Sequence, residues 1–146
     1  MMKIMVCTDG SELSMKGARR AGQLSKLMEG VEIEVVYVHQ TLHIPASVGS
    51  SYASVPIPHN IEFQMKAHGQ SILKRTANLL KEFGANFTTH ILVGHPASTL
   101  VDYADKGSFE LVIIGSKGRT ALQRVFMGSV SSVVVQQVHC DVLVVK

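Results

Sequence analysis

Residues 111–129 read LVIIGSKGRTALQRVFMGS, and this stretch contains the most informative pattern of the sequence. Its first four residues are all apolar, which is typical of a short buried strand. A glycine-rich and basic segment follows, from Gly115 to Met127. Residues 129–138 then have helical spacing, with one side formed by Val130, Val133, Val134 and Val138. A buried strand, a glycine-rich connection and a helix in succession indicate an α/β domain.

The rest of the sequence repeats this alternation of strand and helix. Apolar, β-prone segments, each short enough for a strand, occur at residues 3–8, 32–39, 86–93 and 142–145. Apolar residues at helical spacing lie between them and predict three further helices. Ser11 is a suitable cap for the first helix and Gly30 closes it, Gly84 ends the second, and Pro96 begins the third.

Residues 41–60 do not fit either pattern. They contain three prolines and several serines, and such a long connection predicts an irregular loop that is either mobile or functional. Elsewhere the strict alternation implies parallel strands with helices on both faces. We therefore expect one α/β domain over residues 1–146, with a five-stranded parallel sheet covered by helices on both faces.

The composition is that of a globular protein. Of the 146 residues, 46% are apolar and 17% charged, and the net charge is +3 with neutral histidines. No apolar run approaches the roughly 20 residues of a membrane helix, and no signal peptide precedes the first strand, so we expect a cytoplasmic protein without a membrane partner. Cys7 and Cys140 lack metal-ligand spacing and are expected to be reduced. Scattered charges without interleaved aromatic residues argue against nucleic-acid binding.

The glycine-rich segment has the chemistry of a phosphate site. Phosphate oxygens need several convergent N–H donors, and glycine lets the backbone approach them closely. The helix beginning near Ser129 adds free N–H groups and the positive end of its dipole. Lys117 and Arg119 add positive charge, and Asp9, at the end of the first strand, could accept hydrogen bonds from a sugar or base.

Simpler interpretations of the same residues stay open. The glycines could form an ordinary turn beside surface cations, and Asp9-Gly10-Ser11 is also common turn chemistry. The sequence has neither the Walker phosphate loop nor the dinucleotide-binding glycine pattern. The histidines lack metal-site geometry, and we expect His39 to be a hydrogen-bonded residue at a strand end.

The pattern Gly115-x-x-Gly118, nine residues, then Gly128-Ser129 resembles the ATP-binding signature of the universal stress protein family. Residues 4–11, 93–97 and 139–145 also resemble segments of this family, so the resemblance runs along the whole sequence. It implies a three-layer Rossmann-like α/β sandwich with a five-stranded parallel sheet of strand order 3-2-1-4-5. It also implies a homodimer, formed through the last strand from Val142 to Val145.

The resemblance also implies a set of binding residues. Thr8 and Asp9 would meet the base and ribose, and the backbone at Gln40 would meet adenine. The phosphates would be held by Gly115, Ser116, Gly118, Gly128 and Ser129. The expected nucleotide-binding residues further include Cys7, Lys117, Arg119 and Val130. Cys7 stands where the family often has proline, and Gln40 where it often has valine.

One branch of the family binds ATP and another lacks the glycine signature, and this protein resembles the binding branch. The expected ligand is therefore ATP, or ADP or AMP, with Mg²⁺ as an additional option. The expected role is a regulatory or stress-response module. Two alternatives stay open, a slow ATP hydrolase and a dimeric interaction protein that does not use nucleotide.

Overall fold

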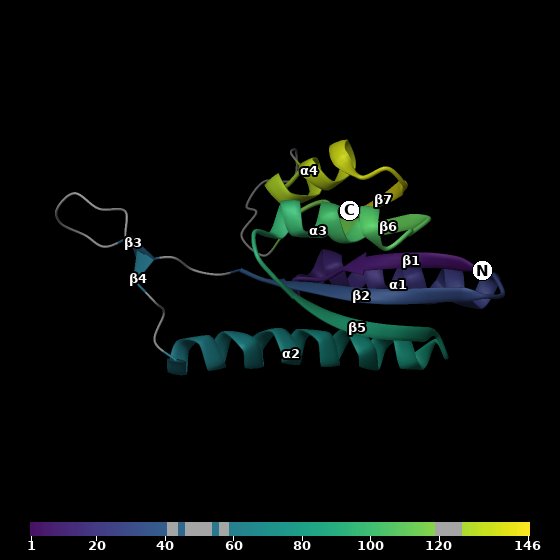
Figure 1. The fold of residues 1–146 in the computed structure, drawn as a ribbon. Helices are drawn as coiled ribbons and strands as arrows, with labels where there is room; N and C mark the ends of the chain where they lie inside the picture. The colour runs from purple at the N-terminus through teal and green to yellow at the C-terminus, as the bar shows by residue number, and fades with distance from the viewer. Residues whose placement is uncertain (41–43, 46–53, 56–58, 119–126) are drawn as a thin grey trace.

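The computed structural model describes residues 1–40, 44–45, 54–55, 59–118 and 127–146. The described residues form a five-stranded parallel sheet with the order β5-β2-β1-β6-β7 (Figure 1). The strands are β1 (Met2–Cys7), β2 (Val31–His39), β5 (Asn86–Val93), β6 (Leu111–Gly115) and β7 (Asp141–Val145). Numbered along the sheet-forming strands, this order is 3-2-1-4-5, so the expected sheet is confirmed.

Four helices cover the two faces of the sheet. They are α1 (Glu12–Leu27), α2 (His59–Glu82), α3 (Pro96–Lys106) and α4 (Ser129–Gln137). One face is covered by α1 and α2, and the other by α3 and α4 (Figure 1). Among the residues with described structure, no helix is both long and apolar enough to cross a membrane.

Two boundaries differ from the sequence prediction. Helix α1 ends at Leu27, before Gly30, because the backbone leaves the helix at Met28 in an extended conformation. Most of residues 41–60 lie outside the described part of the protein. Of this region, β3 (Ile44–Pro45) and β4 (Ser54–Val55) form a short antiparallel pair, where we expected only irregular structure.

The core lies on both sides of the central strand β1. Ile4 and Val6 face α1 and α2, whereas Met5 and Cys7 face α3 and α4. Ile4, Met5 and Val6 expose no surface, and Cys7 is only 6% exposed. A strand buried on both faces must be apolar at consecutive positions, which is the pattern that residues 3–8 have.

Glycines let the helices pack closely. A Cβ at Gly69 of α2 would overlap the ring of Tyr37 on β2, and one at Gly22 of α1 would lie 2.6 Å from the ring of Phe83. Such contacts leave no room for a larger residue. Helix α2 therefore lies directly against the sheet, which fixes its distance from the end of β1.

A polar cluster on the opposite face joins strands β1 and β2 to α3. Glu34 accepts a hydrogen bond from Tyr103 Oη at 2.7 Å and pairs with Lys3 Nζ at 2.8 Å. Burial alone would raise the pKa of Glu34, but the hydrogen bonds from Lys3 and Tyr103 and the nearby positive charges outweigh it and lower that pKa. The carboxylate is thus ionised at neutral pH and ties α3 to the sheet.

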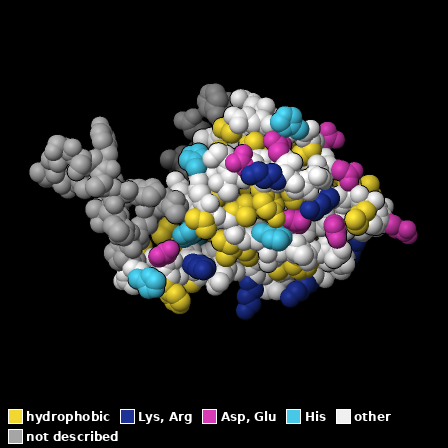
Figure 2. All heavy atoms as spheres, in the orientation of Figure 1, with side chains coloured by type: hydrophobic (Ala, Val, Ile, Leu, Met, Phe, Trp, Pro, Cys, Tyr) yellow, Lys and Arg dark blue, Asp and Glu magenta, His cyan; other side chains and the backbone are white. Residues whose placement is uncertain are grey.

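Charges are mixed on the visible surface. On the face shown in Figure 2, lysine and arginine side chains are interspersed with aspartate and glutamate, and hydrophobic side chains lie between them.

Candidate functional site

A cavity of about 410 Å³ lies at the carboxyl ends of β1 and β6. The strand order reverses here, because β2 and β5 lie on one side of β1 while β6 and β7 lie on the other. Ligands of open parallel sheets bind at this position. Its wall includes ten of the twelve residues expected from the sequence: Cys7, Thr8, Asp9, Gln40, Gly115, Lys117, Gly118, Gly128, Ser129 and Val130.

The turn between β1 and α1 holds Asp9 at the edge of the cavity. Gly10 has a φ of 81°, a left-handed conformation that favours glycine. This conformation lets the backbone N–H of Ser11 donate to Asp9 Oδ1 at 2.9 Å. Ser11 in turn caps α1, because its Oγ accepts from the N–H of Ser14 at 3.2 Å. The carboxylate of Asp9 is therefore fixed by the turn that starts the helix.

Gly115 and Gly118 have different surroundings. A Cβ at Gly115 would lie 3.0 Å from Leu13 Cβ and 3.3 Å from the N atom of Ser14. The absence of a side chain at Gly115 therefore lets α1 pack closely against β6. A Cβ at Gly118 would instead lie 2.9 Å from Asp9 Oδ2, inside the cavity wall. Gly118 is thus the glycine whose missing side chain keeps space open beside the carboxylate.

The start of α4 supplies free backbone donors. Gly128 is the N-cap, and it has no side chain to bond the N–H groups of the first turn. Ser129, Val130 and Ser131 all line the cavity, and N–H groups in a first helical turn have no acceptor within their own helix. These donors and the helix dipole favour a negatively charged group at this end, and Lys117 adds a cation.

Ser116 does not line the cavity, unlike its neighbours in the glycine-rich segment. Its N–H donates to Val145 O at 2.8 Å, and its carbonyl accepts from the N–H of Gly128 at 2.7 Å and from Ser131 Oγ at 2.8 Å. Its backbone therefore fixes the loop to β7 and α4 and has no N–H left for a ligand. Arg119 lies outside the described residues.

Part of the cavity wall is apolar. Val36 and Val38 of β2, Leu100 of α3 and Ile114 of β6 contribute to it, together with Pro96. An apolar slot next to polar groups is typical of sites for flat, partly polar molecules. These residues were not predicted from the sequence, although the valines share one face of a predicted strand, which places them beside the cavity.

Cys7 contributes a neutral thiol to the wall. Burial, and to a lesser degree the charges at Asp9 and Cys140, raises the pKa of Cys7 to about 12. A thiol with such a pKa stays protonated at neutral pH and is a poor nucleophile. Cys7 therefore acts as a small apolar surface.

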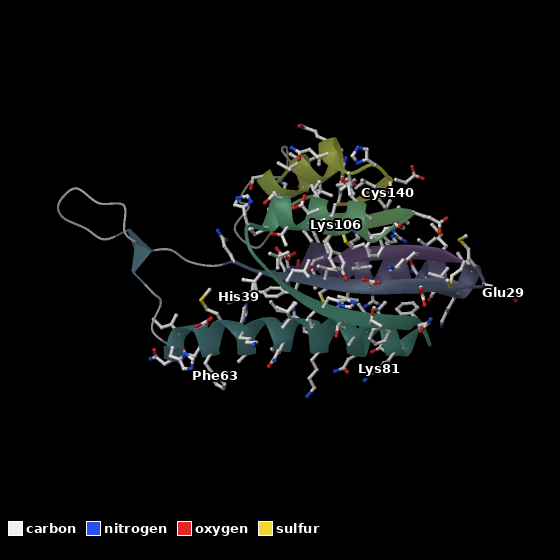
Figure 3. The ribbon with its side chains drawn as sticks, in the orientation of Figure 1. Glu29, His39, Phe63, Lys81, Lys106 and Cys140 are labelled. Atoms are coloured by element: carbon white, nitrogen blue, oxygen red, sulfur yellow. The ribbon has the colours of Figure 1, made fainter. Side chains whose placement is uncertain are left out.

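The side chain of His39 differs from the expectation that it is hydrogen-bonded. The residue is only 9% exposed, and its buried Nδ1 has no hydrogen-bond partner in the described part of the protein. Figure 3 shows His39 between the end of β2 and α2, and it is not part of the cavity wall. The prediction of a hydrogen-bonded side chain is therefore wrong for Nδ1. Within the described ranges, no three metal-ligating side chains form a group.

The fold and cavity define a class, that of Rossmann-like α/β domains with a cavity at the reversal of strand order. The protein belongs to the universal stress protein family, whose family model matches residues 1–146. A universal stress protein of Methanocaldococcus jannaschii is 33% identical over 147 residues, which cover 99% of this protein and 81% of that relative. The resemblance inferred from the glycine pattern is thus confirmed.

Solved structures share the fold. A universal stress protein from Archaeoglobus fulgidus in complex with dAMP has a TM-score of 0.70 and 22% identity, over 100% of this protein and 98% of that one. A universal stress protein family protein from Arabidopsis thaliana with AMP bound has a TM-score of 0.66 and 19% identity, over 100% of this protein and 92% of that one. At these identities the likeness shows the fold alone.

Proposed function

We propose that the cavity at the ends of β1 and β6 binds an adenine nucleotide, with ATP as the preferred ligand. The observation that carries the proposal is the arrangement of three chemistries around one cavity. An apolar slot is formed by Val36, Val38 and Leu100, a fixed carboxylate by Asp9, and free N–H groups by the start of α4. A base, a ribose and phosphates need these three environments. Family membership and the nucleotides bound by the two solved relatives support it.

Nine of the twelve expected residues have a direct role in this proposal. Thr8, Asp9 and the backbone at Gln40 meet the nucleoside, and Cys7 closes the wall behind it. Gly118 leaves room for the phosphates, and Lys117 and Arg119 supply positive charge. The N–H groups of Ser129 and Val130 donate to phosphate oxygens. When bound, Mg²⁺ would neutralise part of the phosphate charge.

We propose a regulatory role in the cytoplasm rather than fast catalysis. The cysteines are both free, as expected in a reducing compartment. Among the described residues of the cavity wall, the only carboxylate is Asp9, and one of its oxygens already accepts from Ser11. A nucleotide that binds one conformation of the cavity wall more tightly shifts the protein toward that conformation and so changes the surface that a partner meets.

The freshly purified protein is expected to release an adenine nucleotide on denaturation, detected by mass spectrometry. After removal of that ligand, added ATP or AMP at 100 times its Kd should stabilise the fold by about 2.7 kcal/mol. Thermal unfolding in a nucleotide series measures this effect, with GTP as the control. No bound nucleotide and no shift would favour the interaction protein that does not use nucleotide. Steady release of ADP from ATP would favour the slow hydrolase.

We further propose a homodimer through β7. In the sheet that the described residues form, β7 pairs only with β6, so its outer edge is unpaired. Leu143 of β7 and Val135 of α4 are 37% and 41% exposed. Apolar edge strands are usually covered or paired, and a second copy of β7 would satisfy both its backbone and its side chains.

Replacing Leu143 by glutamate is expected to raise the dissociation constant of the dimer by about 30-fold or more. A charge in an apolar interface costs about 2 kcal/mol or more. Sedimentation velocity across a concentration series measures the dimer constant. Phe63→Glu is the matched control, because Phe63 is 73% exposed and projects from α2 away from the sheet (Figure 3). Equal dimer constants for Leu143→Glu and the wild type would refute the β7 interface.

A further inference from the structure

Helix α2 contacts the turn that carries Asp9, although its residues do not line the cavity. The guanidinium of Arg75 donates from Nη2 to the carbonyl oxygen of Gly10 at 2.5 Å. The turn also lies directly on the helix, because a Cβ at Gly10 would lie 2.9 Å from Ile72 Cγ1 and 3.4 Å from Arg75 Nη2. Two segments 65 residues apart are thus joined at the rim of the cavity.

The peptide group between Gly10 and Ser11 links Arg75 to Asp9. Its carbonyl oxygen accepts from Arg75, and its N–H donates to Asp9 Oδ1 at 2.9 Å. A peptide group is planar, so its C=O and N–H directions are fixed relative to each other. The guanidinium that holds the carbonyl therefore also sets the direction of the N–H that holds the carboxylate.

Thr76, next to Arg75 on α2, makes a second contact with the same strand end. Thr76 has no exposed surface, and its Oγ1 donates to Ile72 O at 2.9 Å. Ser14 Oγ likewise donates to Ser11 O at 2.9 Å. Both hydroxyl protons are thus engaged, and Thr8 can donate to Ser14 Oγ at 3.2 Å or Thr76 Oγ1 at 3.4 Å. This buried hydroxyl cluster anchors the residue before Asp9 to α1 and α2.

We propose that Arg75, supported by Thr76, is a positioning residue that aims the Asp9 carboxylate at the ribose hydroxyls of the bound nucleotide. The inference rests on the proposed function and adds a residue outside the cavity wall. Arg75 suits this task, because its planar guanidinium stays charged and its donors have a rigid geometry. An alternative role, in which Arg75 only fastens α2 to the turn, predicts no effect on ribose recognition.

The test compares AMP with 2′,3′-dideoxy-AMP, which lacks both ribose hydroxyls, by isothermal titration calorimetry. The wild type should bind AMP more tightly than the dideoxy nucleotide. Arg75→Met should weaken AMP binding roughly three- to tenfold, the range expected for one hydrogen bond, and leave the dideoxy affinity unchanged. The preference for AMP should shrink by the same factor, because a cycle of ligand and protein changes isolates their coupling.

Two further variants make the outcome specific. Lys74→Met removes the neighbouring cation, which lies beside Thr89 and Ile91 of β5 and away from the cavity, and should leave both affinities unchanged. Thr76→Val removes the buried hydroxyl with little change in shape and should also reduce the preference for AMP. This variant gives a second measurement should Arg75→Met lose its fold, which circular dichroism detects.

The outcomes separate the two proposals. No binding of AMP to the wild type would refute the nucleotide site itself. Binding without any preference for AMP over the dideoxy nucleotide would refute ribose recognition by Asp9, and the role of Arg75 with it. A preference that stays unchanged in folded Arg75→Met would overturn the positioning role alone.

Discussion

Replacing Gly118 by valine is expected to abolish nucleotide binding while leaving the domain folded. A Cβ at this position would lie 2.9 Å from Asp9 Oδ2, so the larger side chain displaces the carboxylate and fills space that the phosphates need. Each hydrogen bond to a charged phosphate is worth about 1.5–3 kcal/mol. Loss of two such bonds weakens AMP or ATP binding by at least about 100-fold, which calorimetry can measure.

The stability of Gly118→Val should differ little from that of the wild type. Gly118 is exposed, and surface substitutions usually change stability by no more than about 0.5 kcal/mol. Asn86→Val is a suitable control, since it places the same side chain at the amino end of β5, the opposite end of the sheet. Wild-type affinity in Gly118→Val would show that the phosphates do not pass this position.

Gly115→Ala, unlike Gly118→Val, is expected to lower the stability of the fold. Its new Cβ would lie 3.0 Å from Leu13 Cβ and 3.2 Å from the carbonyl carbon of Leu13, and a helix backbone has less freedom to turn aside than a flexible side chain. Overpacking of this kind costs about 1–3 kcal/mol. Thermal unfolding of the ligand-free protein should show a decrease in Tm of roughly 3–10 °C.

Gly128→Ala is the matched control for this prediction. Gly128 has an extended conformation with a φ of −64°, and its Cβ would lie no closer than 3.4 Å to any neighbour, an ordinary contact. Its Tm should therefore stay close to that of the wild type. A Tm for Gly115→Ala equal to that of Gly128→Ala would show that α1 can move away from β6 without loss of stability.

The sheet could be predicted because its central strands β1 and β6 are buried on both faces. Residues 4–7 and 111–114 are apolar throughout, and the alternation of such strands with helices favours a parallel sheet. The strand order came from the resemblance to a family, since no local pattern states which strands are neighbours. The short pair of β3 and β4 was missed, because its two-residue strands carry no periodic signal.

The site was predictable where it depends on the ends of strands and the starts of helices. Asp9, Gly118 and Ser129 follow or precede predicted elements, and the topology brings such positions together. Ser116 could not be judged from the sequence, because its N–H is engaged by Val145, a partner 29 residues later. Arg75 could not be found either, since its partner Gly10 is brought near only by the packing of α2.

The different surroundings of the two glycines have an evolutionary consequence. Position 115 is constrained by folding, because a methyl group there would crowd the backbone of the adjacent helix. On the proposed function, position 118 is constrained by the ligand and by the neighbouring carboxylate of Asp9, and no packed helix of the described structure constrains it. In a lineage released from selection for nucleotide binding, residue 118 is free to drift while residue 115 stays glycine, so these two columns of an alignment should separate members that kept the ligand from members that kept only the architecture.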